Sequence, residues 1–376
     1  MQDEIIQAVL SRAEVVRYLR GEQGQDLLEA EERIHAYLDE LRTTQRYPMY
    51  RALKHPLYPI LRKIERLQEH VEVARAATAA GRVIYASNHK SHIDYLVQPL
   101  VLDDHGVRPP VIAAGINLFG GALGLLHRHV TGAIPIRRNA KDPAYLVTLK
   151  AYIAEVLRRH DLFVYLEGGR SYSGELKPFK TGMLHAALQA GCPDLVVVPV
   201  AIAYDLVLED HVLARQGVKR SQRAFAREVA EMVRYAVGYQ SRAIVTFGAP
   251  IPLGGYDPDA RRSLVDLMRR TREAIARQYK VLPTALVAAA MRPSIRKTEL
   301  IGRIDDLVDV VRLAGGNLDV SDGRDAVEAA TEPLVTRGVI VVEGDRYRVR
   351  ERQVLRYYAR TIQHLLTDRG GSGLTH

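Results

Sequence analysis

The segment Ser87-Asn88-His89-Lys90-Ser91-His92-Ile93-Asp94 holds a histidine and a carboxylate that could work together as a general base. Near neutral pH the imidazole of His89 can accept a proton from a hydroxyl group. A carboxylate on its other nitrogen would fix the tautomer and stabilise the imidazolium. On one continuous helix, side chains five residues apart point about 140° away from each other. His89 therefore has to precede the helix that we expect to run from this segment to about Leu102.

A structural interpretation of the same segment is also open. Ser91 is followed three residues later by Asp94, which is the spacing of a capping box with Ser91 as N-cap and Asp94 at N3. A histidine in a loop can equally be structural or merely exposed. Both interpretations can hold at once, so the catalytic one depends on the other motifs.

A second polar segment, Glu167-Gly168-Gly169-Arg170-Ser171-Tyr172-Ser173-Gly174, directly follows an apolar stretch. Its glycines expose backbone N–H groups, and Arg170 offers a planar fork that can hold phosphate oxygens. Lys177 and Lys180 follow, and Thr181-Gly182 opens a helix whose N-terminus adds positive potential. This predicts a site for a phosphate-bearing ligand, although a glycine-rich turn with a solvated basic rim would look the same. The segment is neither a Walker A loop nor a GxGxxG motif.

Two further segments are less specific. Residues 132–138 are typical of a short apolar strand that ends in Arg137 and Arg138. Either arginine could be a second phosphate anchor, or both could be ordinary surface charge. Residues 196–204 are typical of a buried strand with an architectural role.

Other kinds of catalysis have weaker support in the sequence. The chain has no GxSxG nucleophile elbow, and its lone cysteine, Cys192, is expected to be structural. Two histidine pairs, His89 with His92 and His127 with His129, lack a convincing third ligand or an HExxH helix. We therefore expect neither a metal ion nor a cofactor.

Composition places the chain among folded, compact proteins larger than a usual single domain: 376 residues, 47% hydrophobic and 26% charged. One cysteine excludes an internal disulfide and suits a reducing compartment, and charges within the first twenty residues argue against a secretory signal. The apolar run 111–126 contains Asn117 and four glycines and is shorter than the roughly 20 residues that span a bilayer. We expect a cytoplasmic protein.

The net charge of +9 favours anionic partners: nucleic acid, acidic headgroups, phosphorylated metabolites or an acidic carrier protein.

Patterning along the chain predicts three regions. Residues 1–75 have helical spacing throughout. Residues 76–255 alternate β-rich and helical segments, which indicates an α/β catalytic domain with a central mixed β-sheet flanked by helices. Residues 256–376 combine helices with a hairpin around Glu343-Gly344-Asp345, which resembles a small winged-helix-like domain. The expected strands are 83–86, 110–114, 133–136, 162–166, 195–203 and 243–247, and the expected helices are 142–159, 220–239, 257–279 and 297–314.

Taken together, these motifs resemble the four sequence blocks of the glycerolipid acyltransferase superfamily, and within it the bacterial glycerol-3-phosphate acyltransferases. The segment from His89 to Asp94 matches the H-x4-D block, and Glu167-Gly168-Gly169-Arg170-Ser171 matches the third block. Gly169 stands where the lysophosphatidate acyltransferase branch more often carries threonine. Arg138 falls on the arginine of the second block and Pro199 on the proline of the fourth. Residues 113–118 and 357–360 also look like this branch, whereas Pro135 replaces the usual aromatic residue.

The resemblance implies the glycerolipid acyltransferase fold and transfer of a fatty acyl group, from acyl-CoA or acyl carrier protein, to the sn-1 hydroxyl of glycerol 3-phosphate. The product would be lysophosphatidic acid, in the first step of phospholipid biosynthesis. His89 and Asp94 would be catalytic. Long acyl chains imply peripheral attachment to an anionic inner-membrane surface, through residues 111–126 or basic stretches such as 292–297, although 111–126 could instead line the acyl channel. The implied substrate-binding residues are Arg138, Glu167, Gly168, Gly169, Arg170, Ser171 and Lys180.

Three alternatives stay open. Acylation of lysophosphatidate or of dihydroxyacetone phosphate would use the same histidine and carboxylate. A nucleic-acid-binding protein is suggested by the basic charge and the winged-helix-like region. Such a protein would have no need for His89, Arg138 and Glu167 in combination, so we expect no nucleic-acid partner.

Overall fold

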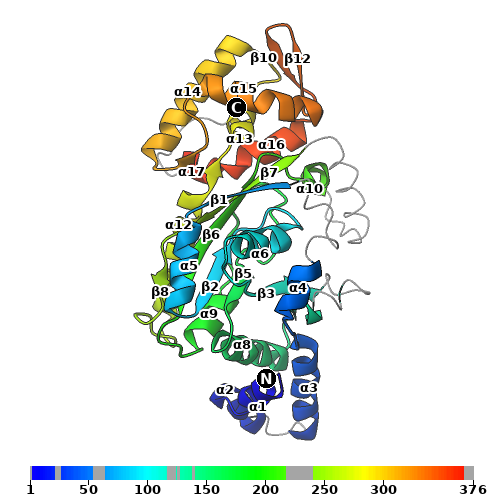
Figure 1. The fold of residues 1–376 in the computed structure, drawn as a ribbon, viewed down its shortest axis with the longest axis vertical. Helices are drawn as coiled ribbons and strands as arrows, with labels where there is room; N and C mark the ends of the chain where they lie inside the picture. The colour runs from blue at the N-terminus through cyan, green and yellow to red at the C-terminus, as the bar shows by residue number, and fades with distance from the viewer. Residues whose placement is uncertain are drawn as a thin grey trace.

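A mixed β-sheet forms the centre of the computed structural model, which describes residues 2–21, 27–53, 64–116, 124, 128–137, 140–216 and 240–367 (Figure 1). Seven strands follow the order β1-β7-β6-β2-β5-β3-β4, and β8 pairs with β6. Neighbouring strands are parallel except that β6 is antiparallel to β7 and β8. The strands are β1 (Ile64–Glu69), β2 (Val83–Ser87), β3 (Val111–Gly115), β4 (Ala133–Ile136), β5 (Leu162–Tyr165), β6 (Val196–Tyr204), β7 (Ser241–Phe247) and β8 (Ile251–Pro252).

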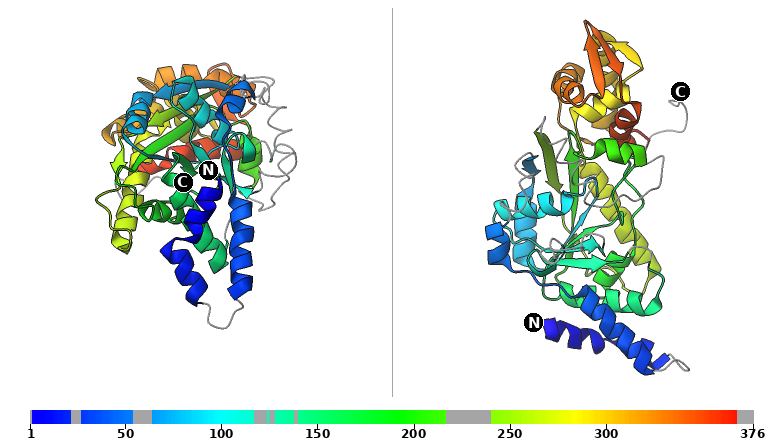
Figure 2. Two further views of the ribbon diagram at one scale, coloured as in Figure 1. Left: turned by 60° about the horizontal axis from the view of Figure 1, so that its bottom comes forward. Right: turned by 90° about the vertical axis from the view of Figure 1, so that its right-hand side faces the viewer.

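The central strands are apolar along almost their whole length because helices cover both faces of the sheet. In the right-hand view of Figure 2, α5 (Val71–Ala80) and α6 (Asp94–Asp104) lie on one side and α12 (Arg261–Gln278) on the other. α8 (Pro143–Leu157) and α9 (Gly182–Leu188) pack against each other. α8 starts sharply because the Asp142 side chain accepts the Ala144 N–H and Pro143 occupies the first turn.

N-terminal helices pack at one end of the sheet, at the bottom of Figure 1. Two ion pairs join them to α8 and its start: Arg12 Nη1 lies 2.9 Å from Glu155 Oε1, and Arg33 Nη2 lies 2.8 Å from Asp142 Oδ2. These helices are α1 (Gln2–Leu10), α2 (Ala13–Gly21) and α3 (Leu27–Leu41). The next helix, α4 (Tyr47–Leu53), lies nearer the middle of the molecule in Figure 1.

C-terminal elements pack at the opposite end, at the top of Figure 1. They follow the order helix, strand, helix, helix, strand, strand, and the strands form an antiparallel sheet β10-β13-β12, which is the winged-helix-like arrangement. The hairpin turns at Gly344, whose φ of 61° favours glycine. These elements are α13 (Pro283–Ala290), β10 (Ser294–Arg296), α14 (Lys297–Leu313), α15 (Gly323–Thr336), β12 (Ile340–Glu343) and β13 (Arg346–Val349). Two helices follow them in the chain, α16 (Arg352–Thr361) and α17 (Gln363–Thr367), and the short strands β9 (Lys280–Val281) and β11 (Asn317–Leu318) pair with each other. An earlier helix, α10 (Asp210–Gln216), packs against α16.

The structure confirms the predicted mixed sheet flanked by helices, but it differs from the sequence expectation at residues 64–69. We expected these residues in the helical N-terminal region, and they instead form β1, parallel to β7. β1 lies at the sheet edge and is mostly polar, so pairing with β7, not its own pattern, makes it a strand. The expected helix 220–239 and most of 111–126 beyond β3 lie outside the described residues, and the domain boundaries stay predictions.

Candidate active site

The candidate site lies where three neighbouring strands end. β2 is parallel to both β5 and β6, so the carboxyl ends of all three meet at one edge of the sheet. His89 follows β2, Glu167 follows β5 and Tyr204 ends β6. Asn88 fastens the β2 end to β6, because its amide donates to Ile202 O at 2.9 Å and accepts from Ile202 N at 2.8 Å.

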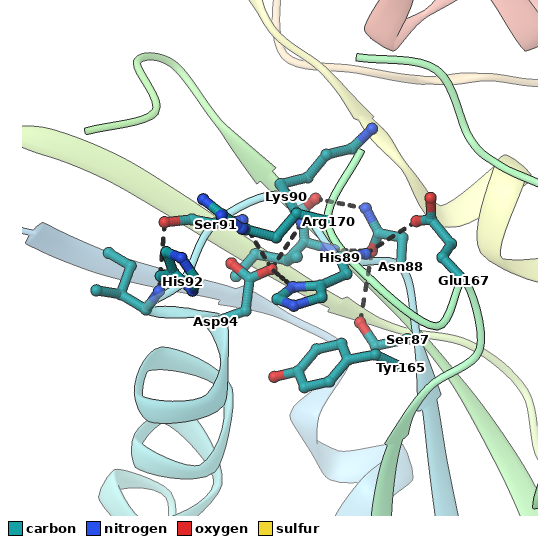
Figure 3. A network of polar contacts seen from close by, with 12 residues as sticks. Ser87, Asn88, His89, Lys90, Ser91, His92, Asp94, Tyr165, Glu167 and Arg170 are labelled. Carbon is teal, nitrogen blue, oxygen red and sulfur yellow. Dashed lines mark hydrogen bonds and ion pairs between the residues drawn. The ribbon is translucent and has the colours of Figure 1, made fainter. Parts of the chain in front are cut away.

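His89 and Asp94 form a hydrogen-bonded pair, with 2.8 Å between Nδ1 and Oδ2 (Figure 3). Asp94 is fully buried. Its Oδ2 also accepts the backbone N–H groups of Lys90 and Ser91, at 2.7 and 3.0 Å, and its Oδ1 accepts the Tyr204 hydroxyl at 2.7 Å. With the carboxylate as acceptor, Nδ1 of His89 carries the proton and Nε2 is left to accept one.

An aromatic ring fixes the plane of the imidazole. Tyr165 stacks on His89 with 4.4 Å between ring centroids, as Figure 3 shows. The Tyr165 hydroxyl donates to Gln98 Oε1 at 3.0 Å, and Gln98 donates to Ser87 Oγ at 2.7 Å. Since the His89 side chain is only 12% exposed, its orientation is set before any ligand arrives.

Burial also sets the protonation of His89. Desolvation lowers the pKa of His89 from its ordinary value of 6.5, and the hydrogen bond and charge of Asp94 oppose that shift only in part. The imidazole is therefore neutral at pH 7, as a general base must be. Burial raises the pKa of Tyr204 well above 10.0, so its hydroxyl stays a donor to Asp94.

Both sequence interpretations of the His89 segment hold in part. α6 begins at Asp94, and the Asp94 carboxylate accepts the Ser91 N–H as the acid of a capping box would. The Ser91 hydroxyl oxygen accepts the Ile93 N–H at 3.3 Å, as an N-cap side chain would, and the hydroxyl also donates to Glu209 Oε2 at 2.7 Å. The carboxylate thus orders the turn and faces His89 at the same time.

The Glu167 loop is bound to the His89 segment on both sides of the histidine. Glu167 Oε1 accepts the His89 N–H at 2.9 Å and its Oε2 accepts the Lys177 N–H at 3.1 Å, while the Ser171 N–H donates to His89 O at 3.0 Å. Glu167 and Ser171 are both buried, and burial raises the pKa of Glu167. Contact of either residue with substrate stays a prediction.

The two glycines allow lysine side chains to close over the loop. Gly168 has a φ of 65°, and a Cβ there would lie 2.8 Å from Lys180 Cδ and Cε, so the stem of Lys180 passes over this residue. Lys177 Nζ donates to Gly169 O at 3.1 Å and to Arg170 O at 3.2 Å. This concentrates positive charge beside His89.

Arg170 is nearly buried, at 5% exposed, and its Nη1 lies 3.3 Å from Glu209 Oε1. The guanidinium also lies 5.4 Å from the centroid of the Tyr172 ring. The sequence motifs did not indicate a role for Glu209 or Tyr204. One signal could have indicated Glu209: the acidic pair Glu209-Asp210 directly follows the short apolar run after β6.

Of the predicted site residues, only Arg138 lies outside the described residues. Figure 3 shows Asp94, Glu167 and Arg170 around His89, Ser171 binds the His89 backbone, and Lys180 passes over Gly168. The neighbouring Arg137 points elsewhere, since its guanidinium pairs with Glu40 and lies over the rings of Tyr37 and Tyr145. Within the part of the chain that the structure describes, no three His, Cys, Asp or Glu residues are grouped as a metal site.

The site thus places a buried carboxylate behind a neutral histidine and beside a basic glycine loop. Residues 62–203, which contain β1 to β5 and all of β6 except its last residue, match the family model described as "Acyltransferase". The chain is also similar to two curated glycerol-3-phosphate acyltransferases. It is 29% identical over 372 residues to the one from Glaesserella parasuis and 28% identical over 384 residues to the one from Aeromonas hydrophila.

These alignments cover 87% and 91% of this chain but 45% and 47% of the relatives, so the chain spans less than half the length of the curated relatives it matches. The resemblance inferred from the four motifs is confirmed. Among solved structures, the 1-acyl-sn-glycerophosphate acyltransferase of Thermotoga maritima aligns with 73% of this chain and 95% of its own, at 14% identity and a TM-score of 0.35. At that score the likeness carries no argument about this protein.

Proposed function

We propose that this protein transfers a fatty acyl group from acyl-CoA or acyl carrier protein to the sn-1 hydroxyl of glycerol 3-phosphate. The observation that carries the proposal is the 2.8 Å contact between His89 Nδ1 and the fully buried Asp94 Oδ2, beside a basic loop. The similarity to glycerol-3-phosphate acyltransferases supports the choice of acceptor.

In the proposed mechanism, Nε2 of His89 removes the proton from the glycerol hydroxyl as its oxygen attacks the thioester carbonyl. The charge of Asp94 stabilises the imidazolium that forms. When the tetrahedral intermediate collapses, the C–S bond breaks and the imidazolium returns its proton to the departing thiolate. The products are lysophosphatidic acid and the free thiol, and His89 is neutral again.

The phosphate of the acceptor would bind to positive side chains around the glycine loop. Arg138 and Lys180 would supply charge, and Arg170 reaches the same region in an orientation that Glu209 fixes. Glu167 and Ser171 would keep the loop against His89. The mechanism uses no metal ion or cofactor, so we expect activity to survive exhaustive chelation; full loss of activity would contradict this.

The acyl chain and product partition into lipid, so we propose peripheral attachment at the cytoplasmic face of the inner membrane. Within its described residues, the chain has no helix long and apolar enough to cross a membrane. Basic surface, not a membrane span, would then supply the attachment.

The test is thiol release from palmitoyl-CoA and from acylated carrier protein, in detergent, with and without glycerol 3-phosphate, for wild type and His89→Ala. We expect acceptor-dependent release that the substitution abolishes. Lysophosphatidate and dihydroxyacetone phosphate serve as competing acceptors. Turnover with one of them alone would make that compound the acceptor, and silence with every acceptor would contradict the proposal.

A further inference from the structure

We propose that Arg337 and Tyr358, from the C-terminal elements, are positioning residues for the catalytic loop, acting through the acidic pair Glu209-Asp210. The inference rests on the function proposed above and assigns the winged-helix-like end of the molecule a part in that reaction. Both residues bind Asp210 and the backbone of residues 207 and 208. Their effect must pass through the segment 207–210, which lies between them and the site.

Glu209 faces the site and binds three of its residues, Ser91, His92 and Arg170. Its Oε1 accepts the His92 N–H at 2.6 Å and lies 3.3 Å from Arg170 Nη1, and its Oε2 accepts the Ser91 hydroxyl at 2.7 Å. The carboxylate is fully buried. Ser91 and His92 stand between His89 and Asp94 in the chain, so Glu209 fixes the turn that brings the catalytic pair together.

Asp210, the next residue, faces the opposite way and is held by the C-terminal elements. Arg337, which directly follows α15, places Nη2 2.5 Å and Nε 3.1 Å from Asp210 Oδ1. The hydroxyl of Tyr358 on α16 donates to Asp210 Oδ2 at 2.6 Å. Asp210 is fully buried and the Arg337 side chain is 7% exposed, so water does not compete for this pair.

The same two residues also bind the backbone just before Glu209. Arg337 Nη2 donates to Leu208 O at 2.7 Å, and the Val207 N–H donates to the Tyr358 hydroxyl at 2.9 Å. Figure 1 shows α10, which begins at Asp210, beside α16. Arg337 and Tyr358 thus hold both the Asp210 side chain and the backbone of residues 207 and 208. A shift of either residue therefore moves Glu209 as well.

Loss of this support should affect the acceptor side of the reaction. The turn that carries His89 would lose its anchor, and Arg170 would lose the carboxylate that orients it. Misplacing a reacting group by about 1 Å can cost on the order of a hundredfold in rate. We therefore expect a lower kcat and a higher KM for glycerol 3-phosphate, with the KM for the acyl donor little changed.

The experiment compares Arg337→Gln and Tyr358→Phe with the control Asp319→Asn in the full chain. Asp319 Oδ2 pairs with Arg242 Nη2 of β7 at 3.3 Å, so the control weakens a different link between the C-terminal elements and the sheet. Deuterium uptake by peptides covering residues 88–94 is measured without substrate, and kcat and both KM values are measured with substrate. Tyr358→Phe keeps the ring and removes one hydroxyl, which serves if Arg337→Gln fails to fold.

We expect both test variants to speed deuterium uptake in residues 88–94 and to lower kcat about tenfold or more, whereas Asp319→Asn does neither. Faster uptake confined to residues 207–210 and the C-terminal helices, or equal effects in the control, would overturn the proposal. Because deuterium uptake is read without substrate, it tests the positioning even if glycerol 3-phosphate proves to be the wrong acceptor.

Discussion

His89 is held by a carboxylate and an aromatic ring, and each fixes a different property of its imidazole. Asp94 sets which nitrogen carries the proton, and Tyr165 sets the plane of the ring. Burial then lowers the pKa of the imidazole, so the basic form persists into mildly acidic solution. A histidine with these constraints needs little rearrangement to accept a proton.

The first prediction concerns the pH dependence of the wild-type rate. The neutral imidazole is the active form, and the pKa of His89 lies below 6.5. The value of kcat/KM should therefore stay constant from neutral pH to below 6.5 and then fall as His89 becomes protonated.

The substitution Asp94→Asn removes the carboxylate that raises this pKa. We expect kcat to fall by about 10³-fold or more, with the midpoint of the remaining activity at lower pH. A midpoint that moves upward in Asp94→Asn would contradict this assignment.

Lys90 shows how one side chain joins two elements. Its ammonium is 2% exposed, donates to Gly174 O at 2.6 Å and lies 5.2 Å from the centroid of the Tyr279 ring. Desolvation lowers its pKa. The residue thus ties the His89 segment to the far end of the glycine loop.

We predict that Lys90→Met separates stability from activity. Methionine fills similar volume and removes a buried charge, while it leaves Gly174 O without its donor. These effects oppose each other, so the free energy of unfolding should change by less than about 2 kcal/mol. Turnover should fall about tenfold because the two loops are no longer joined. Urea unfolding and kcat test this, with Lys150→Met on α8 as a control of unchanged turnover; wild-type turnover in Lys90→Met would refute it.

Gly174 of the glycine loop lies against the backbone of α16. Its φ is 88°, and a Cβ there would lie 2.1 Å from the carbonyl oxygen of Tyr357, a backbone atom that cannot turn aside. Gly344 has a φ of 61° with nothing within 4 Å of the corresponding Cβ. Both glycines have a positive φ that would strain an alanine, but only at Gly174 would the added Cβ also meet a neighbouring backbone atom.

We predict that Gly174→Ala destabilises the fold by at least about 2 kcal/mol more than Gly344→Ala, which should cost about 1 kcal/mol from backbone strain alone. Thermal and urea unfolding of both variants measure the difference. Equal losses would mean that the glycine loop and α16 can separate without cost.

Local pattern predicted most of the elements, and its failures have physical causes. The strand ends, the His89 segment and the glycine loop follow from apolar runs bounded by polar motifs, which are local signals. β1 was missed because its pairing with β7 joins residues 64–69 to residues 241–246. The roles of Tyr204 and Glu209 were missed for the same reason, since they depend on contacts across more than a hundred residues of sequence. Arg337 and Tyr358 lie further still from the residues they support.

At the scale of the whole molecule, the winged-helix-like end carries an acidic helix. In helix-turn-helix proteins the second helix enters the DNA groove, and here the corresponding helix, α15, exposes Asp325, Glu328 and Glu332 against Arg324 alone. Phosphates would be repelled there. The charge of α15 therefore supports the expectation of no nucleic-acid partner.

The sheet of the C-terminal hairpin gathers arginines on its exposed side. Arg296 of β10 stands directly opposite Arg346 of β13, and Arg348 is the next exposed residue along the same strand. Glu343 of β12 stands opposite Arg346 and its Oε2 lies 3.1 Å from Arg348 Nη1, so a single carboxylate faces these three arginines. The sheet therefore keeps an excess of positive charge, which, in a chain of net charge +9, suits contact with an anionic membrane.

We therefore predict that the protein co-sediments with phosphatidylglycerol vesicles at low salt and progressively less as salt rises, and that it does not bind phosphatidylcholine vesicles. Arg296→Glu combined with Arg346→Glu should weaken binding strongly. The control, Arg269→Glu with Arg277→Glu on α12, changes the net charge equally at arginines that pair with Glu273. If both double variants lose binding to the same extent, overall charge governs attachment. If only the first does, the winged-helix-like end faces the membrane, and the acyl chain reaches His89 from a protein oriented by its C-terminal sheet.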